Sequence, residues 1–261
     1  MIRVGIGGWV YEPWRGVFYP KGLPQARELE HASRHLTAIE INGTFYGTQK
    51  RESFQRWFAE TPDAFVFSLK GPRFATNRRV LAEAGESIER FFNSGVLELK
   101  QKLGPIFWQM APTKQFVPDD FAAFLALLPS KLDGRAIRHA VEVRHESFMT
   151  PEFVALLRKY AVAPVLVDSD KHPMIADVTS DFIYARLQRT QEKVKTGYAP
   201  ADLDAWAKRA QAWEEGGAPD DLSTITPAPR SKGKRDVFVF MISGAKVRAP
   251  AAAMALIERV K

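Results

Sequence analysis

The sequence predicts a single (β/α)8 barrel of the TIM type, an α/β fold with eight parallel strands. Eight short apolar runs recur along the 261 residues, and a helical pattern follows almost every one of them. The runs lack clean period-two alternation, which is typical of strands that are covered on both faces, as in a parallel sheet. No glycine-rich phosphate loop follows any run, and no composition shift marks a boundary. We therefore expect closure into one domain over residues 1–261, and not an open doubly wound sheet.

The predicted strands are short and rich in Val, Ile, Leu, Phe and Ala. They cover residues 2–7, 38–42, 64–70, 105–110, 139–143, 164–168, 182–187 and 237–241. The predicted helical segments cover residues 25–35, 51–60, 88–99, 118–128, 151–160, 203–213 and 250–260. Thr150 is expected to cap the fifth of these, because Pro151 suits the first helical position. Only the connection after Asp168, the end of the sixth strand, lacks a helical pattern.

One segment differs in composition from the rest of the chain. Residues 216–236 are rich in Gly, Pro, Ser and charge, and such a loop is long for a compact domain. We expect a flexible insertion on the N-terminal face of the barrel, since it joins a helix to a strand. The alternative is a basic contact arm, because residues 230–235 read RSKGKR.

Composition excludes several classes of site. The chain has no cysteine, so disulfides, thiolate metal sites and a cysteine nucleophile are ruled out. No run approaches the roughly 18 apolar residues of a membrane span, and the N-terminus lacks the pattern of a signal peptide. We therefore expect a soluble, cytoplasmic protein. The net charge of +7 is spread thinly and suits nucleic acid or a small anion as a partner, or only solubility.

Polar side chains at the C-terminal ends of the strands are the candidate site residues, because TIM-type barrels place their chemistry there. By strand alternation Glu40 and Asn42 share one side, and so do Glu142 and Arg144, so both pairs can point into the barrel. The expected substrate-binding residues are Trp9, Tyr11, Asn42, Tyr46, Lys70, Gln109, Arg144 and Arg186. The candidate catalytic residues are Glu40, Glu142 and His145.

The expected cluster sets the cations of Lys70, Arg144 and Arg186 against the carboxylates of Glu40, Glu142 and Asp168. Such a set suits interior ion pairs, and it also suits a grip on phosphate or carboxylate, which arginine binds bidentately. His145 is a candidate general acid or base near neutral pH.

A metal site has little support in the sequence. The acids of the cluster and His145 could form an oxygen-rich divalent site, but no ligand spacing such as HExxH occurs. We assign no metal ligand, and the cofactor stays unknown because no nucleotide-binding motif is present. No GxSxG motif points to a serine nucleophile.

Six motifs carry a resemblance to a known family. They are GWVYEPWRGVFYP (8–20), IEINGTFYG (39–47), FVFSLKGP (65–72), LGPIFWQMAP (103–112), AVEVRHESF (140–148) and YARL (184–187). Because these motifs occur in the same order, the chain resembles the YecE-like proteins, also called domain of unknown function 72, over nearly its whole length. The resemblance implies a TIM-type barrel and no established activity.

The chain departs from the family pattern at polar positions. Asn77 and Gln188 stand where the family usually has histidines, and Met241 begins a stretch that typically holds Asp or Asn. Phe148 stands where relatives commonly have tryptophan. These changes put catalytic activity in doubt.

Three functions stay open from the sequence. The first is an enzyme acting on a small anionic metabolite, with the cations holding the anion and Glu40, Glu142 or His145 moving protons. The second is a nucleic-acid-associated protein, either binding or acting on phosphodiesters. The third is a paralogue that binds a small molecule without turning it over.

Overall fold

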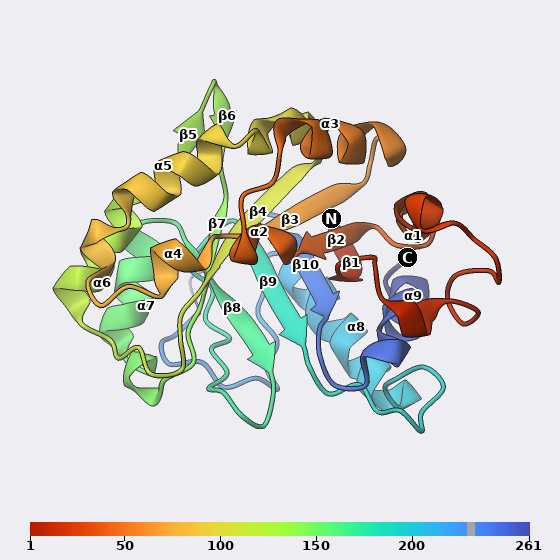
Figure 1. Cartoon of the computed structure of the whole chain (residues 1–261). Coiled ribbons are helices and arrows are strands. Elements are labelled where there is room, and N and C mark those ends of the chain that lie inside the picture. Colours follow the sequence, from red (N-terminus) through yellow and green to blue (C-terminus); the bar gives the residue numbers. More distant parts are fainter. Residues whose placement is uncertain (229–232) are drawn as a thin grey trace.

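Eight parallel strands close into a barrel in the order β1-β10-β9-β8-β7-β4-β3-β2 (Figure 1). The computed structural model describes residues 1–228 and 233–261. The barrel strands are β1 (Ile2–Gly7), β2 (Ala38–Ile41), β3 (Val66–Lys70), β4 (Leu103–Gln109), β7 (His139–Glu142), β8 (Ala163–Asp168), β9 (Phe182–Leu187) and β10 (Asp236–Met241). Each predicted strand is present, with bounds shifted by two residues or fewer. The predicted fold class is therefore confirmed.

Helices surround the barrel (Figure 1). The main ones are α1 (Glu28–His35), α3 (Arg51–Glu60), α5 (Gly85–Asn93), α6 (Pro118–Leu127), α7 (Pro151–Lys159), α8 (Pro200–Glu214) and α9 (Ala249–Val260). Two single turns follow strands at the barrel mouth, α2 (Gly43–Tyr46) and α4 (Arg73–Thr76). Short 3-10 turns are η1 (Glu12–Trp14), η2 (Gln25–Arg27), η3 (Leu81–Glu83), η4 (Val96–Lys102), η5 (Glu146–Phe148) and η6 (Lys246–Arg248). No helix forms in residues 169–181, after β8, as the sequence indicated.

Two local predictions need correction. The helix expected over 88–99 is divided, because Gly95 adopts a φ of 108° and separates α5 from η4. A small hairpin was missed: β5 (Lys131–Leu132) pairs antiparallel with β6 (Arg135–Ala136). Its turn residues Asp133 and Gly134 both have positive φ, and Asp-Gly is the dipeptide that such turns favour.

The barrel interior is filled in layers. Phe107, Tyr184, Phe238 and Phe240 are fully or almost fully buried and fill its middle with aromatic rings. Above them, toward the C-terminal ends of the strands, the interior becomes polar. The floor of aromatic side chains closes the barrel below this polar layer, so the layer faces only the C-terminal mouth.

The segment 216–236 returns from α8 to β10 and makes specific contacts where it is described. The carboxylate of Asp177 accepts hydrogen bonds from the amides of Ile225 and Thr226, both at 2.9 Å. The buried guanidinium of Arg235 donates to the carbonyl of Gly217 at 2.6 Å. Residues 229–232 lie outside the described residues, and with them part of the predicted basic arm 230–235. The flexibility of the segment and the single-domain organisation stay predictions.

Within the two described ranges, no helix is both long enough and apolar enough to cross a membrane.

Candidate functional site

Arg186 is the centre of the polar layer. Its guanidinium projects from β9 into the barrel, where it is 3% exposed. Nε and Nη2 donate to the two carboxylate oxygens of Glu40, both at 3.0 Å, so this pair is bidentate. Nη1 donates to Oε2 of Glu142 on the opposite side of the barrel. One buried cation thus bridges two fully buried carboxylates.

Glu142 is further held by its neighbours along the rim. Its Oε1 accepts hydrogen bonds from Nε2 of Gln109 and from Nε of Arg144, each at 2.7 Å. Burial by itself would raise the pKa of Glu142, but Arg186 and Arg144 outweigh it and hold the pKa at about 2. Glu142 is therefore ionised throughout the neutral range.

Glu40 anchors the other side of the layer. Its Oε1 accepts from the side-chain Nδ2 of Asn42 at 2.9 Å, and its Oε2 accepts from the hydroxyl of Tyr184 at 2.8 Å. The Tyr184 hydroxyl lies 2.7 Å from the hydroxyl of Ser68. Burial, and after it the charge of Glu40, raise the pKa of Tyr184 well above its ordinary value, so it stays a hydrogen-bond donor.

Lys70 completes the layer from the end of β3. Its Nζ donates to Oε1 of Gln109 at 2.8 Å and lies 3.9 Å from the centre of the Phe45 ring. Burial, and after it the charge of Arg186, lower the pKa of Lys70 to about 8. Its ammonium group is thus the least firmly protonated cation of the cluster.

A cavity of about 890 Å³ opens above this layer. Aromatic side chains from the β1 and β2 side line part of it, including Trp9, Trp14, Tyr46 and Trp57. The basic side chains on its wall are Lys70, Arg144, Lys171, His172, Arg186 and Lys246. Among the described residues, no Asp or Glu lines this cavity. The two carboxylates beneath it are fully buried and already paired with arginines, so the wall presents positive charge.

Seven predicted site residues come together as expected around one mouth. They are Glu40, Asn42, Lys70, Gln109, Glu142, Arg144 and Arg186. Trp9 and Tyr46 line the cavity above them. The binding and catalytic roles assigned to these residues stay predictions.

Tyr11 and His145 lie apart from the cavity lining. The Tyr11 ring packs against Trp14, and the Nζ of Lys246 lies 4.5 Å from its centre. Nδ1 of His145 accepts the amide hydrogen of Ser147 at 3.1 Å and so caps the turn η5. These contacts give both residues a structural role in addition to any predicted one.

The expected convergence of Asp168 with the cluster is wrong. Alternation along β8 places Val165 and Val167 in the barrel interior, so Asp168 faces outward. There its carboxylate pairs with Arg189 at 3.1 Å and accepts from the hydroxyl of Tyr198 at 3.3 Å.

The divalent site considered from the acids and His145 has no geometric support. Arg186 lies between the two glutamates, and Asp168 faces away from them. In residues 1–228 and 233–261, no group of three or more His, Asp or Glu side chains is placed to hold a metal ion.

Sequence reasoning missed three basic lining residues, Lys171, His172 and Lys246, and the aromatic Trp57. Lys171 and His172 belong to the connection after β8, whose lack of a helical pattern was the available signal. Long loops of this kind commonly carry function. Trp57 lies inside α3, where an apolar pattern gives no hint that it reaches the mouth.

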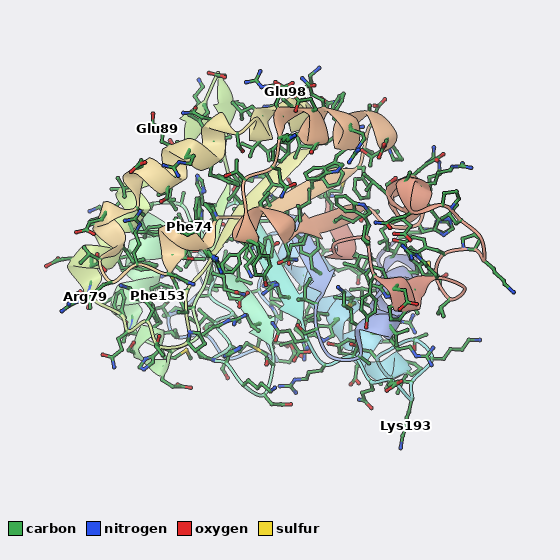
Figure 2. The ribbon with its side chains drawn as sticks, viewed as in Figure 1. Phe74, Arg79, Glu89, Glu98, Phe153 and Lys193 are labelled. Atoms are coloured by element: carbon green, nitrogen blue, oxygen red, sulfur yellow. The ribbon has the colours of Figure 1, made fainter. Side chains whose placement is uncertain are left out.

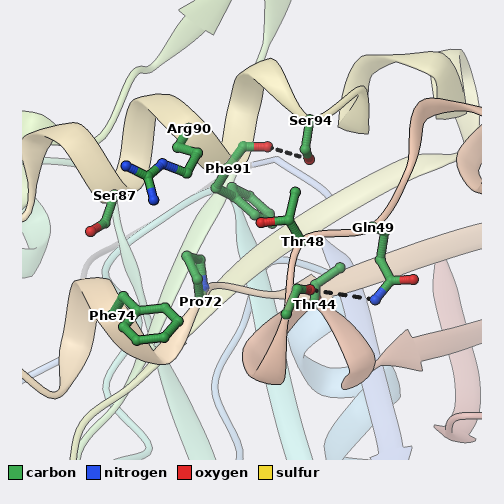
Figure 3. Close-up of a pocket in the computed structure, with 10 residues that line it drawn as sticks. Thr44, Thr48, Gln49, Pro72, Phe74, Ser87, Arg90, Phe91 and Ser94 are labelled. Carbon is green, nitrogen blue, oxygen red and sulfur yellow. Dashed lines mark hydrogen bonds between the residues drawn. The ribbon is translucent and has the colours of Figure 1, made fainter.

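A second, smaller cavity lies between α4 and α5 (Figure 3). It holds about 80 Å³ and is lined by residues such as Thr44, Phe74 and Phe91. Phe74 belongs to α4 (Figure 2), and this residue is 59% exposed. The hydroxyls of Thr44 and Ser94 donate to backbone carbonyls, so these lining hydroxyls are already satisfied. This cavity has neither the size nor the charge of the barrel mouth.

Comparison with known proteins gives one family. A family model described as protein of unknown function DUF72 matches residues 3–261. UPF0759 protein YecE of Escherichia coli (strain K12) is 28% identical over 151 residues, which are 57% of this chain and 50% of YecE. UPF0759 protein YunF of Bacillus subtilis (strain 168) is 25% identical over 158 residues, which are 59% of this chain and 54% of YunF. The matched region thus spans about half the length of these curated relatives.

A solved structure supports the fold. A DUF72 family protein from Thermotoga maritima MSB8 superposes with a TM-score of 0.75 at 21% identity, covering 99% of this chain and 98% of that one. At this identity the likeness concerns the fold alone.

Proposed function

This chain belongs to the DUF72 family of proteins of unknown function, as its motifs predicted, and from that premise we propose that its barrel mouth binds a small anionic metabolite. The metabolite carries a phosphate or a carboxylate group. The observation that carries the proposal is the charge of the cavity wall, which presents six basic side chains and, among the described residues, no acidic one. Clefts of one charge concentrate ligands of the opposite charge.

Arg144 is the proposed anchor for the anion. Its side chain is 21% exposed at the rim, whereas Arg186 beneath it is almost fully buried. Glu142 holds the Arg144 guanidinium through contacts of 2.7 Å from both Nε and Nη2. A guanidinium that is already oriented loses less conformational entropy when it binds a ligand.

We further propose that the site is catalytic. Lys70, with a pKa of about 8, is a group that can exchange protons near neutral pH. The pKa of His172, on the same cavity wall, is lowered by burial and then by Arg144. Glu142 suits this task poorly because its pKa is about 2. The proton-transfer roles of Glu40, Glu142 and His145 stay predictions, and turnover separates an enzyme from a binding-only paralogue.

The proposal is tested by measuring the Tm of the protein while phosphate or citrate replaces chloride at constant ionic strength. A ligand at 100 times its Kd stabilises the fold by about 2.7 kcal/mol, so we expect the Tm to rise by several degrees. Arg144→Ala is expected to abolish this rise and leave the apo protein folded. Arg189→Ala is the matched control, because this arginine pairs with Asp168 and Asp170 outside the cavity lining.

Absence of stabilisation of the wild type by any anion contradicts the proposal. Nucleic acid is the alternative partner, supported by the net charge of +7. It predicts binding of DNA or RNA that weakens steeply as salt rises, because bound phosphates release counterions. Such binding, together with no response to small anions, favours this alternative.

A further inference from the structure

We propose that Lys70 is a catalytic amine that forms an imine with the carbonyl carbon of an anionic aldehyde or ketone bound in the cavity. This inference rests on the proposed function and deepens it, since it names the substrate class: a carbonyl compound that also carries a phosphate or carboxylate.

The amino group of Lys70 contacts a neutral amide and two aromatic rings, and among the described residues it has no carboxylate ion-pair partner. Its Nζ donates to a neutral amide oxygen, Oε1 of Gln109, at 2.8 Å. The faces of two aromatic rings surround it, Phe45 at 3.9 Å and Phe107 at 5.8 Å. The nearby carboxylates are instead paired with arginines.

Burial and a neighbouring charge favour the neutral form of Lys70, although the aromatic contacts favour the ammonium. Burial, followed by the charge of Arg186, lowers the pKa of Lys70 from 10.5 to about 8. Roughly a tenth of such an amine is neutral at pH 7, about 300 times more than at a pKa of 10.5. Only the neutral amine is a nucleophile, and burial beside other cations is a known way of producing it.

The position of Lys70 suits a substrate held by its anionic group. Lys70, Arg144 and Arg186 line one cavity. When the anionic group of a substrate binds Arg144, the rest of that substrate lies in the cavity above Lys70. In the proposed step the nitrogen attacks the carbonyl carbon and a C–N bond forms. The C–O bond then breaks, and the oxygen leaves as water with the two protons of the neutral amine. No oxidant or reductant is needed.

Two other lysines line the cavity, and neither belongs to the polar layer of Gln109 and Arg186, although burial also lowers the pKa of Lys246. Lys171 is exposed in the connection after β8. Lys246 lies over the rings of Tyr11 and Trp14, at 4.5 and 5.4 Å from their centres, and so sits on the aromatic side of the mouth. Their adducts therefore provide internal comparisons in one sample.

Pyridoxal 5′-phosphate, an anionic aldehyde, is the probe. The full-length wild type is incubated with a stoichiometric amount, reduced with borohydride to fix any imine, digested and mapped by mass spectrometry. We expect the adduct at Lys70, at least tenfold above Lys171, Lys246 and Lys193. Lys193 is exposed and points away from the molecule (Figure 2). Inorganic phosphate is expected to lower labelling of Lys70 at least fivefold, and pyridoxal without the phosphate to label it at least tenfold less.

Two variants accompany the mapping. Lys70→Arg keeps the cation but has no imine-forming amine, so it is expected to retain stabilisation by phosphate and lose the adduct. Lys193→Arg is expected to leave labelling of Lys70 unchanged. Because the map is made on the wild type, the proposal remains testable even where Lys70→Arg does not fold.

The outcomes separate this inference from the proposed function. Stabilisation by phosphate with labelling spread over exposed lysines overturns the imine and leaves anion binding intact. Labelling of Lys70 that is equal with pyridoxal and insensitive to phosphate supports the amine and contradicts the anion site. Neither stabilisation nor labelling of Lys70 overturns both.

Discussion

Arg186, Glu40 and Glu142 depend on one another for their charges. Burial alone would lower the pKa of Arg186, but Glu142 and Glu40 raise it, so this cation stays charged inside the barrel. A buried pair of this kind adds little net stability, yet removal of one partner leaves an uncompensated charge and is strongly destabilising. We therefore expect the cluster to be rigid and, through Glu142, to hold Arg144 in a fixed orientation toward the cavity.

The acid stability of the protein is expected to depend on Glu142. Its pKa is lowered in the fold, from 4.5 to about 2. Ionised Glu142 therefore stabilises the fold fully above pH 4.5, and this contribution is lost as the pH falls toward 2. The loss is about 3 kcal/mol in the free energy of unfolding.

Urea unfolding at several pH values between 5 and about 2 measures this contribution. Glu142→Gln has no carboxyl group at this position, so its free energy of unfolding is expected to fall less than that of the wild type across the window. Equal pH dependence of the two proteins contradicts the assignment.

At the scale of elements, the junction between β1 and β2 limits which residues can build the barrel. A Cβ at Gly5 would lie 2.0 Å from the backbone oxygen of Ala38, which belongs to the paired strand and cannot move aside cheaply. Glycine is thus required here for the close approach of two strands beneath the polar layer.

Gly5→Ala is expected to cost about 3 kcal/mol of unfolding free energy, because the added methyl group forces β1 and β2 apart. Gly47→Ala is the matched control. Its φ is −167°, and no atom lies within 4 Å of a Cβ added there, so a change within about 0.5 kcal/mol is expected. Chemical denaturation measures both, and similar values for the two variants contradict the packing argument.

At the scale of the whole molecule, closure joins the first and last strands. β1 pairs with β10 from Ile2 with Val237 to Ile6 with Met241, so the first and last strands are neighbours in one closed sheet. If one strand unfolded alone, the strands on either side of it would each lose their hydrogen-bonding partner and become exposed sheet edges. This favours unfolding of the barrel as one unit.

The single-domain organisation predicts one cooperative transition. The six tryptophans lie on elements around the barrel, from Trp9 after β1 to Trp206 and Trp213 in α8. Tryptophan fluorescence and far-ultraviolet circular dichroism are therefore expected to give the same urea midpoint. Two separated midpoints contradict a single domain.

The sequence by itself determined the fold and the rim residues that meet. Apolar runs reveal strands because burial on both faces requires them, and alternation places Glu40 beside Asn42 and Glu142 beside Arg144 on inward faces. Alternation also predicts that Asp168 faces outward once Val165 and Val167 are known to face the interior. That Asp168 lies at the end of a strand does not by itself reveal which way its side chain points. The dipeptide Asp133–Gly134 also carried the signal of the missed hairpin.

Only the tertiary structure decided which charges neutralise one another and which face the cavity. Arg186 and Glu40 are 146 residues apart in the chain, and their bidentate contact depends on the closure of the sheet. Lys171, His172 and Lys246 reach the mouth through loops whose paths depend on packing and leave no periodic pattern. Burial and neighbouring charge arise from the fold and not from residue type, and they lower the pKa of Lys70, which the sequence could identify only as a cation at the end of a strand.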